Sequence, residues 1–461
     1  MSGANTPPYT EYVPADPPWL GRIPKGWRVL RGKYSFHEHS ERSDTGNELL
    51  LSVSEYFGVK PRQDTVDAGE HLSRAESLVG YKKCAVNDLV MNIMLAWKKG
   101  LGVSKYEGIV SPAYSVFRFM RHVNPDYMHY LLRTDLYSDY FKARSTGIMD
   151  SRLRLYPDSF RDVALLLPTK GEQTQIAKFL DYETARIDAL IEKQQQLIAL
   201  LKEKRQAVIS HAVTKGLNPD APMRNSGVEW IGEVPAHWEV SRLKYAARVV
   251  DCRNKTPEYF DDGEYFVIRT TNVKEQQLRL DESTLRTDQR NFDIWTQRGI
   301  PPAGSILFTR EAPAGEVCLV PAEAKLCMGQ RMMNFIPYNE SQVDYLFSYL
   351  LSDCLTRYIG SVSLGSTVSH LRVDQVENIP VPVPPDEEAR GISKEVTSLR
   401  EKMGKLIGIA VRKINVLQER RIALISAAVT GKIDVRGWQP PSELENASTT
   451  TSETDSIELP A

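Results

Sequence analysis

Two stretches of the chain carry apolar residues at spacings of three and four, the pattern of a helix with one apolar stripe. In residues 172–214 the stripe consists of Ile187, Leu190, Ile191, Leu197, Ile198, Leu201 and Val208. The second stripe consists of Ile392, Val396, Leu399, Met403, Leu406, Ile407, Ala410, Ile414, Leu417 and Leu424. Neither stripe can be buried by its own helix, so we expect two long helices, 169–215 and 386–436, packed as an antiparallel coiled coil. The alternative, ordinary core helices within single domains, is disfavoured because both stretches far exceed the usual ~10–14 residues.

Each long stretch follows a region in which short β-rich runs lead into a shorter helical stretch. In the first half the predicted strands are residues 48–53, 89–95 and 114–120, and the predicted helix is 127–144. In the second half the strands are residues 265–269, 305–309 and 332–336, and the helix is 345–358. This repeated order predicts an α/β (mixed α+β) domain used twice, at residues 1–168 and 230–385, with residues 216–229 as the linker.

The two halves also begin and end alike. Residues 19–34 and 230–245 share Trp, Gly, Pro, Trp, Val, Arg, Lys and Tyr at the same spacing. Residues 201–214 and 417–430 share Leu-x-Glu-x-Arg and the ending Ile-Ser-x-Ala-Val-Thr. Matched ends around divergent middles predict a pseudo-two-fold internal repeat, the geometry with which proteins address two half-sites on a duplex.

The composition predicts where the protein is located and what kind of DNA-binding surface it can have. No apolar run in the 461 residues approaches the ~18 that span a bilayer, and the first residues lack the features of a signal peptide. We therefore expect a cytoplasmic protein with no membrane partner. The formal net charge of -1 excludes a uniformly basic DNA surface, so any such surface is a local patch. Residues 437–461 hold five acidic and no basic residues and predict a disordered acidic tail.

Three motifs with possible chemistry fall short of their usual context. The five cysteines are scattered without a Cys-x-x-Cys pair, and His37-Glu38-His39 lacks the spacing of a helical zinc site, so we expect a polar loop and no metal. Asp16-Pro17-Pro18-Trp19 matches the motif of adenine N6-methyltransferases, but no Gly-rich turn for S-adenosylmethionine accompanies it. The chain also lacks a P-loop, which excludes an ATP-driven motor. We predict no catalytic residues.

The divergent middles place cations beside aromatic or base-reading side chains. Arginine reads guanine O6 and N7, and asparagine or glutamine reads adenine N6 and N7. The candidate DNA-binding residues are Lys82, Lys83, Lys98, Lys99 and Lys105 in the first half, and Arg269, Thr271, Asn272, Arg310, Gln330 and Arg331 in the second. For each of them the alternative is a solvated loop residue. Cations common to both halves, such as Arg31 and Arg242, cannot distinguish two half-sites and are expected to contact phosphates or to be structural.

The chain resembles the specificity subunit of type I restriction-modification systems. The likeness is carried by Pro-x-x-Trp-x-Val at 24–29 and 235–240, by Leu-Pro-x-x-x-Glu-Gln-x-x-Ile-Ala at 167–177, and by the duplicated helix ends. It covers the chain apart from the first ~18 residues and the acidic tail. One departure is Ala389, which stands where Gln173 stands in the first half and leaves the start of the second helix in doubt.

The resemblance implies two target-recognition domains separated by the two helices, each reading one half of a bipartite sequence in double-stranded DNA. It also implies two methyltransferase subunits that use S-adenosylmethionine, and restriction subunits with motor and nuclease activity that use ATP and Mg²⁺. This chain itself would be non-catalytic and hold no cofactor. The alternatives are a methyltransferase that uses Asp16 to Trp19, and a structural adaptor that joins partner proteins without reading DNA.

Overall fold

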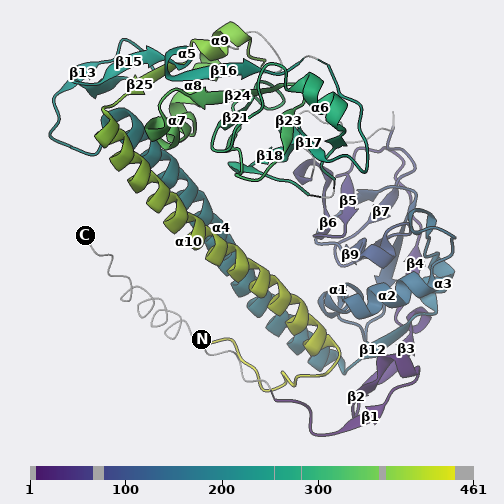
Figure 1. Ribbon diagram of the computed structural model, residues 1–461. Coiled ribbons are helices and arrows are strands. Elements are labelled where there is room, and N and C mark those ends of the chain that lie inside the picture. The colour runs from purple at the N-terminus through teal and green to yellow at the C-terminus, as the bar shows by residue number, and fades with distance from the viewer. Residues whose placement is uncertain (1–6, 66–76, 254, 282, 363–369, 442–461) are drawn as a thin grey trace. The chain divides into compact units, whose positions relative to one another are not determined.

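The structure is a computed structural model that describes residues 7–65, 77–253, 255–281, 283–362 and 370–441 (Figure 1). The chain forms two compact units. Unit 1 comprises residues 1–193 and 413–461, and unit 2 comprises residues 194–412. Each unit therefore contains one mixed domain together with one end of each long helix.

The domain of unit 1 is built around an antiparallel sheet in the order β4-β11-β8-β9. These strands are Phe36–His39, Tyr114–Phe119, Leu89–Asn92 and Leu101–Val103. The remaining antiparallel pairs are β1 (Tyr12–Pro14) with β2 (Arg22–Pro24), β3 (Arg28–Arg31) with β12 (Ala164–Leu167), β5 (Leu51–Ser54) with β6 (Gly58–Pro61), and β7 (Lys82–Cys84) with β10 (Gly108–Val110). Helices α1 (Pro125–Leu132), α2 (Asp135–Arg144) and α3 (Pro157–Arg161) contribute Tyr127, Tyr137 and Phe160 to one apolar core with this sheet.

The domain of unit 2 has a corresponding sheet in the order β16-β24-β21-β22. These strands are Ala247–Asp251, Met332–Pro337, Ile306–Thr309 and Val317–Leu319. A second sheet has the order β20-β17-β23, with Arg286–Thr287, Tyr265–Ile268 and Leu326–Met328. The smaller pairs are β13 (Met223–Asn225) with β14 (Glu233–Pro235), β15 (Glu239–Arg242) with β25 (Pro380–Val383), and β18 (Val273–Lys274) with β19 (Gln277–Leu278). The helices are α5 (Leu243–Ala246), α6 (Gln289–Trp295), α7 (Val343–Leu350), α8 (Asp353–Val362) and α9 (Val373–Glu377).

Strands were predicted more accurately than the short helices. The predicted strands at 89–95, 114–120, 305–309 and 332–336 are confirmed as β8, β11, β21 and β24. The stretch predicted as one helix over 127–144 is two helices, because Thr134 adopts an extended backbone and its side chain accepts a hydrogen bond from Tyr137 N to begin α2. Residues 345–358 are likewise divided between α7 and α8. The loop expected at His37 to His39 is strand β4, paired with β11.

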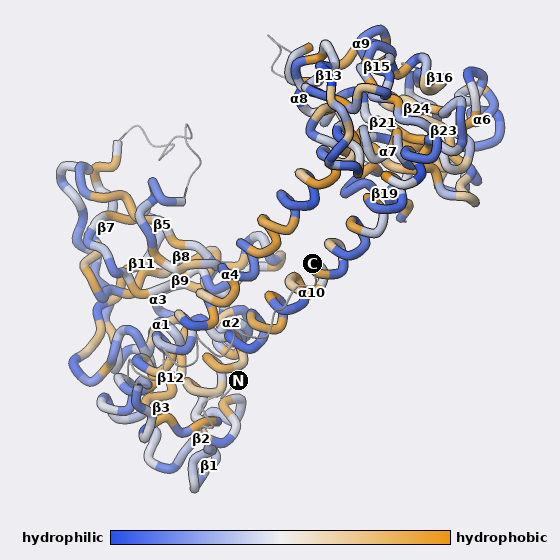
Figure 2. Tube along the Cα trace, turned by 90° about the vertical axis from the view of Figure 1, so that its left-hand side faces the viewer, coloured by the Kyte–Doolittle hydropathy of each residue, from blue (hydrophilic) through white to orange (hydrophobic). Residues whose placement is uncertain are grey.

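The two long helices are α4 (Lys170–Lys215) and α10 (Asp386–Val429). In unit 1, the first part of α4 and the last part of α10 run antiparallel. Asp188 of α4 pairs with Arg421 at 2.9 Å, and Gln175, which comes earlier on α4, donates to the carbonyl of Val435, which comes later in the chain than Arg421. In unit 2, Leu217 lies beside Gly391 and Arg205 lies near Arg400, which gives the same sense. Apolar and polar residues alternate along both helices (Figure 2). Helix α10 ends at Val429, before the boundary expected at 436. Gly431, two residues later, adopts a left-handed φ of 75°, which is typical of a helix C-terminus.

Each domain holds the start of one long helix and the end of the other. In unit 1, Trp27 Nε1 donates to Glu172 at 3.1 Å near the start of α4, and Tyr127 donates to the carbonyl of Val429 at 3.3 Å at the end of α10. In unit 2, Trp238 Nε1 donates to Glu388 at 2.8 Å near the start of α10. Tyr345 donates to the carbonyl of Val213 at 2.9 Å near the end of α4. Both domains are thus fixed to the helices through buried aromatic side chains.

The last described residues continue this packing. The Trp438 ring lies 5.3 Å from that of Phe179 and 5.5 Å from that of Tyr182, so the start of the predicted acidic tail lies against α4. Residues 442–461 of that tail lie outside the described residues. Across the described part of the chain, every helix is too short or too polar to cross a bilayer.

Candidate nucleic-acid interface

In unit 2 the strand ends bring most of the predicted DNA-binding residues together. Arg269 follows β17, Arg310 follows β21, and Gln330 and Arg331 lie between β23 and β24. Gly329 N donates to the carbonyl of Ile268, and Arg310 N donates to the carbonyl of Arg331, both at 2.8 Å. These backbone hydrogen bonds hold the ends of β17, β21 and β23 and the start of β24 next to one another, at one edge of the domain.

Two of the predicted residues at this edge have structural contacts. Arg310 is only 7% exposed, and its guanidinium pairs with Asp251 at 3.1 Å. Asn272 is 8% exposed, accepts a hydrogen bond from Arg269 N, and donates to the carbonyl of Arg279. The Asn272 side chain therefore shapes the short 3-10 turn at Thr270–Asn272.

The other predicted residues of unit 2 are exposed at the same edge. Arg269, Thr271, Gln330 and Arg331 all face solvent. Arg331 adopts a left-handed φ of 71° and pairs with Glu311 at 2.7 Å. Four polar side chains of the kind that contacts base edges and phosphates thus lie on neighbouring turns.

Sequence reasoning did not identify Glu311 and His370 at this edge. Glu311 accepts from Arg331, and its other oxygen lies 2.6 Å from His370 Nδ1. The same two residues form an isolated antiparallel β-bridge. No motif precedes His370, and 59 residues separate it from Glu311, so only the fold brings them together.

In unit 1 the five predicted lysines fall into three separate places. Lys82 and Lys83 on β7 pair with Glu38 at 3.9 Å and Glu41 at 2.8 Å. The Lys83–Glu41 hydrogen bond raises the pKa of that lysine and lowers the pKa of that glutamate. Lys105 pairs with Asp126 at the start of α1.

Lys98 and Lys99 form the third place, the turn between β8 and β9. Lys98 Nζ lies 4.9 Å from the centre of the Trp97 ring, as does Lys142 from α2. Lys99 adopts a left-handed φ of 63° and pairs with Asp135 at 2.6 Å. Of the five lysines, this pair best matches the predicted grouping of cations with an aromatic ring.

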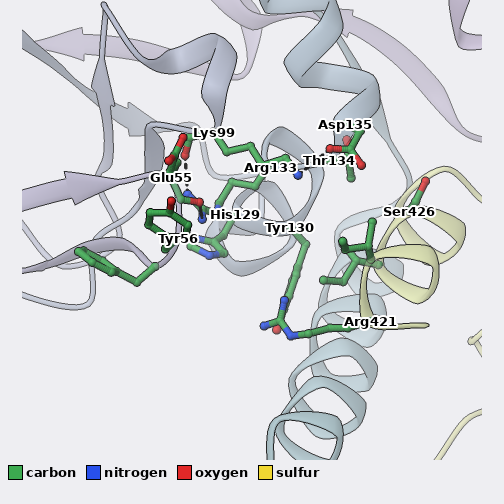
Figure 3. A pocket seen from close by; sticks show the side chains of 13 residues that line it. Glu55, Tyr56, Lys99, His129, Tyr130, Arg133, Thr134, Asp135, Arg421 and Ser426 are labelled. Carbon is green, nitrogen blue, oxygen red and sulfur yellow. Dashed lines mark hydrogen bonds and ion pairs between the residues drawn. The ribbon is translucent and has the colours of Figure 1, made fainter. Parts of the chain in front are cut away.

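A cleft of about 380 Å³ lies beside this turn (Figure 3). Its walls come from the β5–β6 hairpin tip, the Lys99 turn, α1 and the C-terminal part of α10. Burial lowers the pKa of His129 to about 3, and the nearby Arg133 acts in the same direction, so the imidazole is neutral at pH 7. Its Nδ1 accepts a hydrogen bond from Val103 N at 3.2 Å. Burial, followed by the charge of Arg421, lowers the pKa of Arg133 to about 10, which leaves its guanidinium charged.

The motifs considered for catalysis lie in structural surroundings. The Trp19 ring stacks on Tyr140 at 4.1 Å and packs against Tyr137, so the Asp16-to-Trp19 segment is fixed to α2. Burial raises the pKa of the Cys84 and Cys318 thiols to about 12, which makes them poor nucleophiles. Among the described residues, no three His, Cys, Asp or Glu side chains are placed to share a metal ion.

The cations common to both halves mostly have local partners. Arg31 and Lys33 lie 3.5 Å and 3.9 Å from Asp162, and Arg242 donates to Asn378 at 3.0 Å. Arg372 pairs with Asp374 at 3.4 Å. These contacts support a structural contribution from the repeated positions.

Comparison with known proteins gives a consistent picture. Residues 235–407 match the family model of the type I restriction modification DNA specificity domain. The chain is 23% identical over 436 residues to the type I restriction enzyme MjaVIII specificity subunit of Methanocaldococcus jannaschii, covering 90% of this chain and 95% of that protein. It is 24% identical over 319 residues to the putative MjaX specificity subunit of the same organism, covering 68% and 69%. A chain from a solved structure of complex assembly and conformational transition in a type I R-M system has the same fold, with a TM-score of 0.66, 15% identity and coverage of 89% and 99%.

Proposed function

We propose that this chain is a DNA-recognition subunit like the type I restriction-modification specificity subunits that it resembles, and that each of its units reads one half of a bipartite site. The main support for the proposal is that the domain of each unit contacts the two long helices in the same way. Trp27 and Trp238 contact the starts of the long helices, and Tyr127 and Tyr345 contact their ends. Two domains that contact the helices in the same way, but differ in their surfaces, can bind two different half-sites through a pseudo-two-fold repeat.

The expected domain boundaries belong to this proposal. The target-recognition domains are residues 1–168 and 230–385, the spacer helices are 169–215 and 386–436, and the linker and acidic tail are 216–229 and 437–461. The antiparallel pairing of the helices within each unit supports a coiled coil as the spacer between the domains. In this arrangement the length of the helices sets the distance between the half-sites.

The reading surfaces differ between the units. In unit 2 we assign recognition to the edge that carries Arg269, Thr271, Gln330 and Arg331, with Asn272 and Arg310 as its structural support. In unit 1 we assign it to Lys98 and Lys99, with Lys82, Lys83 and Lys105 as further candidates for phosphate contacts. The divergence of the two surfaces allows the half-sites to differ in sequence.

The long helices offer a surface for partner subunits. In unit 2, Leu200 is 62% exposed and lies on the same helix as the exposed Leu197, while Ile409 is exposed on α10. In unit 1, Val416 is 62% exposed. Exposed apolar side chains along a helix are typical of an interaction site. We propose that two methyltransferase subunits dock here and carry S-adenosylmethionine, and that restriction subunits with ATP and Mg²⁺ complete the enzyme.

Neither alternative function has comparable support. A methyltransferase would need Asp16 to Trp19 at an open site, whereas Trp19 stacks against α2. A structural adaptor would not need the polar edge at Arg269 and Arg331. The relatives are named specificity subunits, which favours a non-catalytic DNA-reading chain over both alternatives.

The proposal is tested with the full chain in complex with a type I methyltransferase subunit and a randomised duplex library. We expect adenine methylation only in duplexes that carry two short sequence blocks at a fixed spacing, with two methyltransferase subunits per chain. The chain alone should transfer no methyl group. Methylation at one contiguous block, or equal methylation of all duplexes, would overturn the bipartite assignment.

A further inference from the structure

A partly buried arginine in unit 1 links a helix to two turns of the recognition domain. Arg133, at the end of α1, donates to the carbonyl oxygens of Ser54 at 3.4 Å and Glu55 at 2.8 Å in the β5–β6 hairpin. It also donates to the carbonyl oxygens of Lys99 at 2.7 Å and Leu101 at 2.6 Å in the β8–β9 turn. One guanidinium therefore fixes the hairpin tip and the Lys98–Lys99 turn relative to each other (Figure 3).

The turn that Arg133 holds has a strained backbone. Lys99 lies in the left-handed region at φ 63°, where a residue with a Cβ is unfavourable. Such a conformation persists when surrounding contacts determine it, and strained turns are concentrated at functional sites. The Lys99 carbonyl is one of the four Arg133 acceptors, so this contact acts directly on the strained residue.

Close backbone packing reinforces the same arrangement. A Cβ added to Gly102 would lie 3.0 Å from Gly58 Cα, and one added to Gly58 would lie 3.1 Å from His129 Cε1. The hairpin and β9 can approach this closely only because both positions are glycine. His129, one turn before Arg133 on α1, accepts from Val103 N and completes the support.

Unit 2 has a counterpart with a different arginine. Arg400 of α10 donates to Gln276 Oε1 at 2.9 Å, and its guanidinium lies 5.1 Å from the centre of the Phe347 ring on α7. Gln276 and its neighbour Glu275 form the tip of the β18–β19 hairpin with φ values of 66° and 52°. A two-residue turn of this kind normally carries Asn, Asp or Gly, so this tip is also strained and held from a helix.

We infer that Arg133 and Arg400 are positioning residues, each of which holds the reading turns of its own unit in the geometry that discriminates one half-site. This inference rests on the proposed function, in which the two units read different halves. Arg133 acts through the Lys98–Lys99 turn and the hairpin beside it, where Tyr56 is 85% exposed. Arg400 acts through the β18–β19 hairpin, which follows the Thr270–Asn272 turn directly in the chain.

The test compares Arg133→Gln and Arg400→Gln in the full chain, assembled with a type I methyltransferase subunit and selected on the randomised bipartite library. We expect Arg133→Gln to reduce discrimination about tenfold in one sequence block and to leave the other unchanged, since a wrong base pair costs a comparable factor. Arg400→Gln should do the reverse. Arg186→Gln and Arg412→Gln, which remove the same charge from exposed positions on the long helices, are the matched controls and should leave discrimination unchanged in both blocks.

Amide hydrogen exchange separates a positioning effect from general unfolding. In Arg133→Gln we expect faster exchange at residues 54–57 and 99–101 with slow exchange retained in α4 and α10. Arg133→Lys keeps the charge but not the fork, so it should shift the same block to a smaller extent. If wild type selects no bipartite site, the proposed function fails. If wild type selects two blocks but Arg133→Gln and Arg133→Lys change neither, or change both equally, the positioning inference alone is wrong.

Discussion

At the scale of single residues, the structure separates candidate side chains that face solvent from candidate side chains that already have partners inside the fold. Arg310 and Asn272 were predicted from the sequence beside Arg331 and Thr271, and all four residue types suit base or phosphate contacts. Only the fold distinguishes them, because Arg310 and Asn272 are less than one-tenth exposed and have partners within the unit. The sequence shows which side chains can donate or accept hydrogen bonds, but not which of them already have hydrogen-bond partners inside the folded protein.

This distinction predicts opposite phenotypes for two neighbouring substitutions. Arg310→Met removes the nearer of the two arginines that pair with Asp251 among the described residues and leaves Arg298 at 3.6 Å, so we expect a loss of about 2 kcal/mol in unfolding free energy. Gln330→Ala removes an exposed side chain and should change stability by less than about 0.5 kcal/mol while weakening discrimination in one half-site. Urea unfolding and library selection measure the two effects. Equal loss of stability in both variants would show that the Gln330 turn is structural.

His129 gives a pH dependence whose sign follows from its burial. Its pKa falls from the usual 6.5 to about 3 in the folded chain, so the unfolded chain binds a proton more readily in between. The stability that neutral His129 contributes is complete above pH 6.5 and is lost as the pH falls from 6.5 towards 3. The slope is about 1.4 kcal/mol per pH unit for one proton.

His129→Gln should remove that dependence, because a glutamine oxygen can accept the Val103 hydrogen bond without titrating. The difference in unfolding free energy between wild type and variant, measured by urea unfolding from pH 7 to pH 5, should shrink or reverse at the lower pH. His122→Gln at a more exposed position on the same domain is the control. A difference that does not vary with pH would contradict the assigned titration.

At the scale of elements, apolar periodicity predicted the two long helices and missed the positions at which a side chain or a backbone break divides the shorter ones. The apolar stripes identified both long helices because their period is uninterrupted over many turns. The predicted helices at 127–144 and 345–358 also had apolar periodicity, but a capping threonine in the first and a corresponding break before Asp353 in the second divide them. Contacts distant in sequence, such as those of Arg133 with both hairpins, left no local signal at all.

The start of the second long helix shows how the same element forms with a different residue. Gln173 is buried, accepts from Asn124 N and donates to the carbonyl of Pro168. Ala389 cannot make these bonds, which left the helix start uncertain from the sequence. In unit 2, Asp386 accepts from Asn339 and Gln342 instead, so a carboxylate at the N-terminus replaces the amide.

The exposed apolar residues of the long helices predict where a partner binds. Leu200→Glu should weaken binding of a methyltransferase subunit by about tenfold or more, since it places a charge in an apolar contact. Gln195→Glu adds the same charge to an exposed position on the same helix and should have a much smaller effect. Isothermal titration of the purified chain with the partner subunit measures both. Unchanged affinity in Leu200→Glu would place the docking surface elsewhere.

At the scale of the whole molecule, the described segments that lie nearest the two termini contact each other in unit 1. In unit 1, Asp434 N donates to the carbonyl of Pro7 at 2.7 Å, and the Tyr12 hydroxyl donates to the carbonyl of Gly431 at 2.9 Å. In unit 2 the continuous segment after α4 takes the equivalent path. Gly216 adopts φ 74° beside Trp238, as Gly431 adopts φ 75° beside Trp27. Unit 1 thus has a non-covalent contact at this point, where unit 2 has a covalent linker.

This equivalence predicts that a circular permutant will fold and read DNA. Residues 441 and 7 are joined by a flexible Gly-Ser linker of about eight residues, because Asp434, seven residues before 441, already contacts Pro7. New ends are opened between Asn218 and Pro219. Both sequence blocks and their spacing should match those of wild type, because each domain keeps its contacts with both helices. Opening the chain between Gln195 and Gln196 instead interrupts α4 and should destabilise the protein. Loss of one block in the first permutant, with a normal melting temperature, would show that the covalent linker orients that domain.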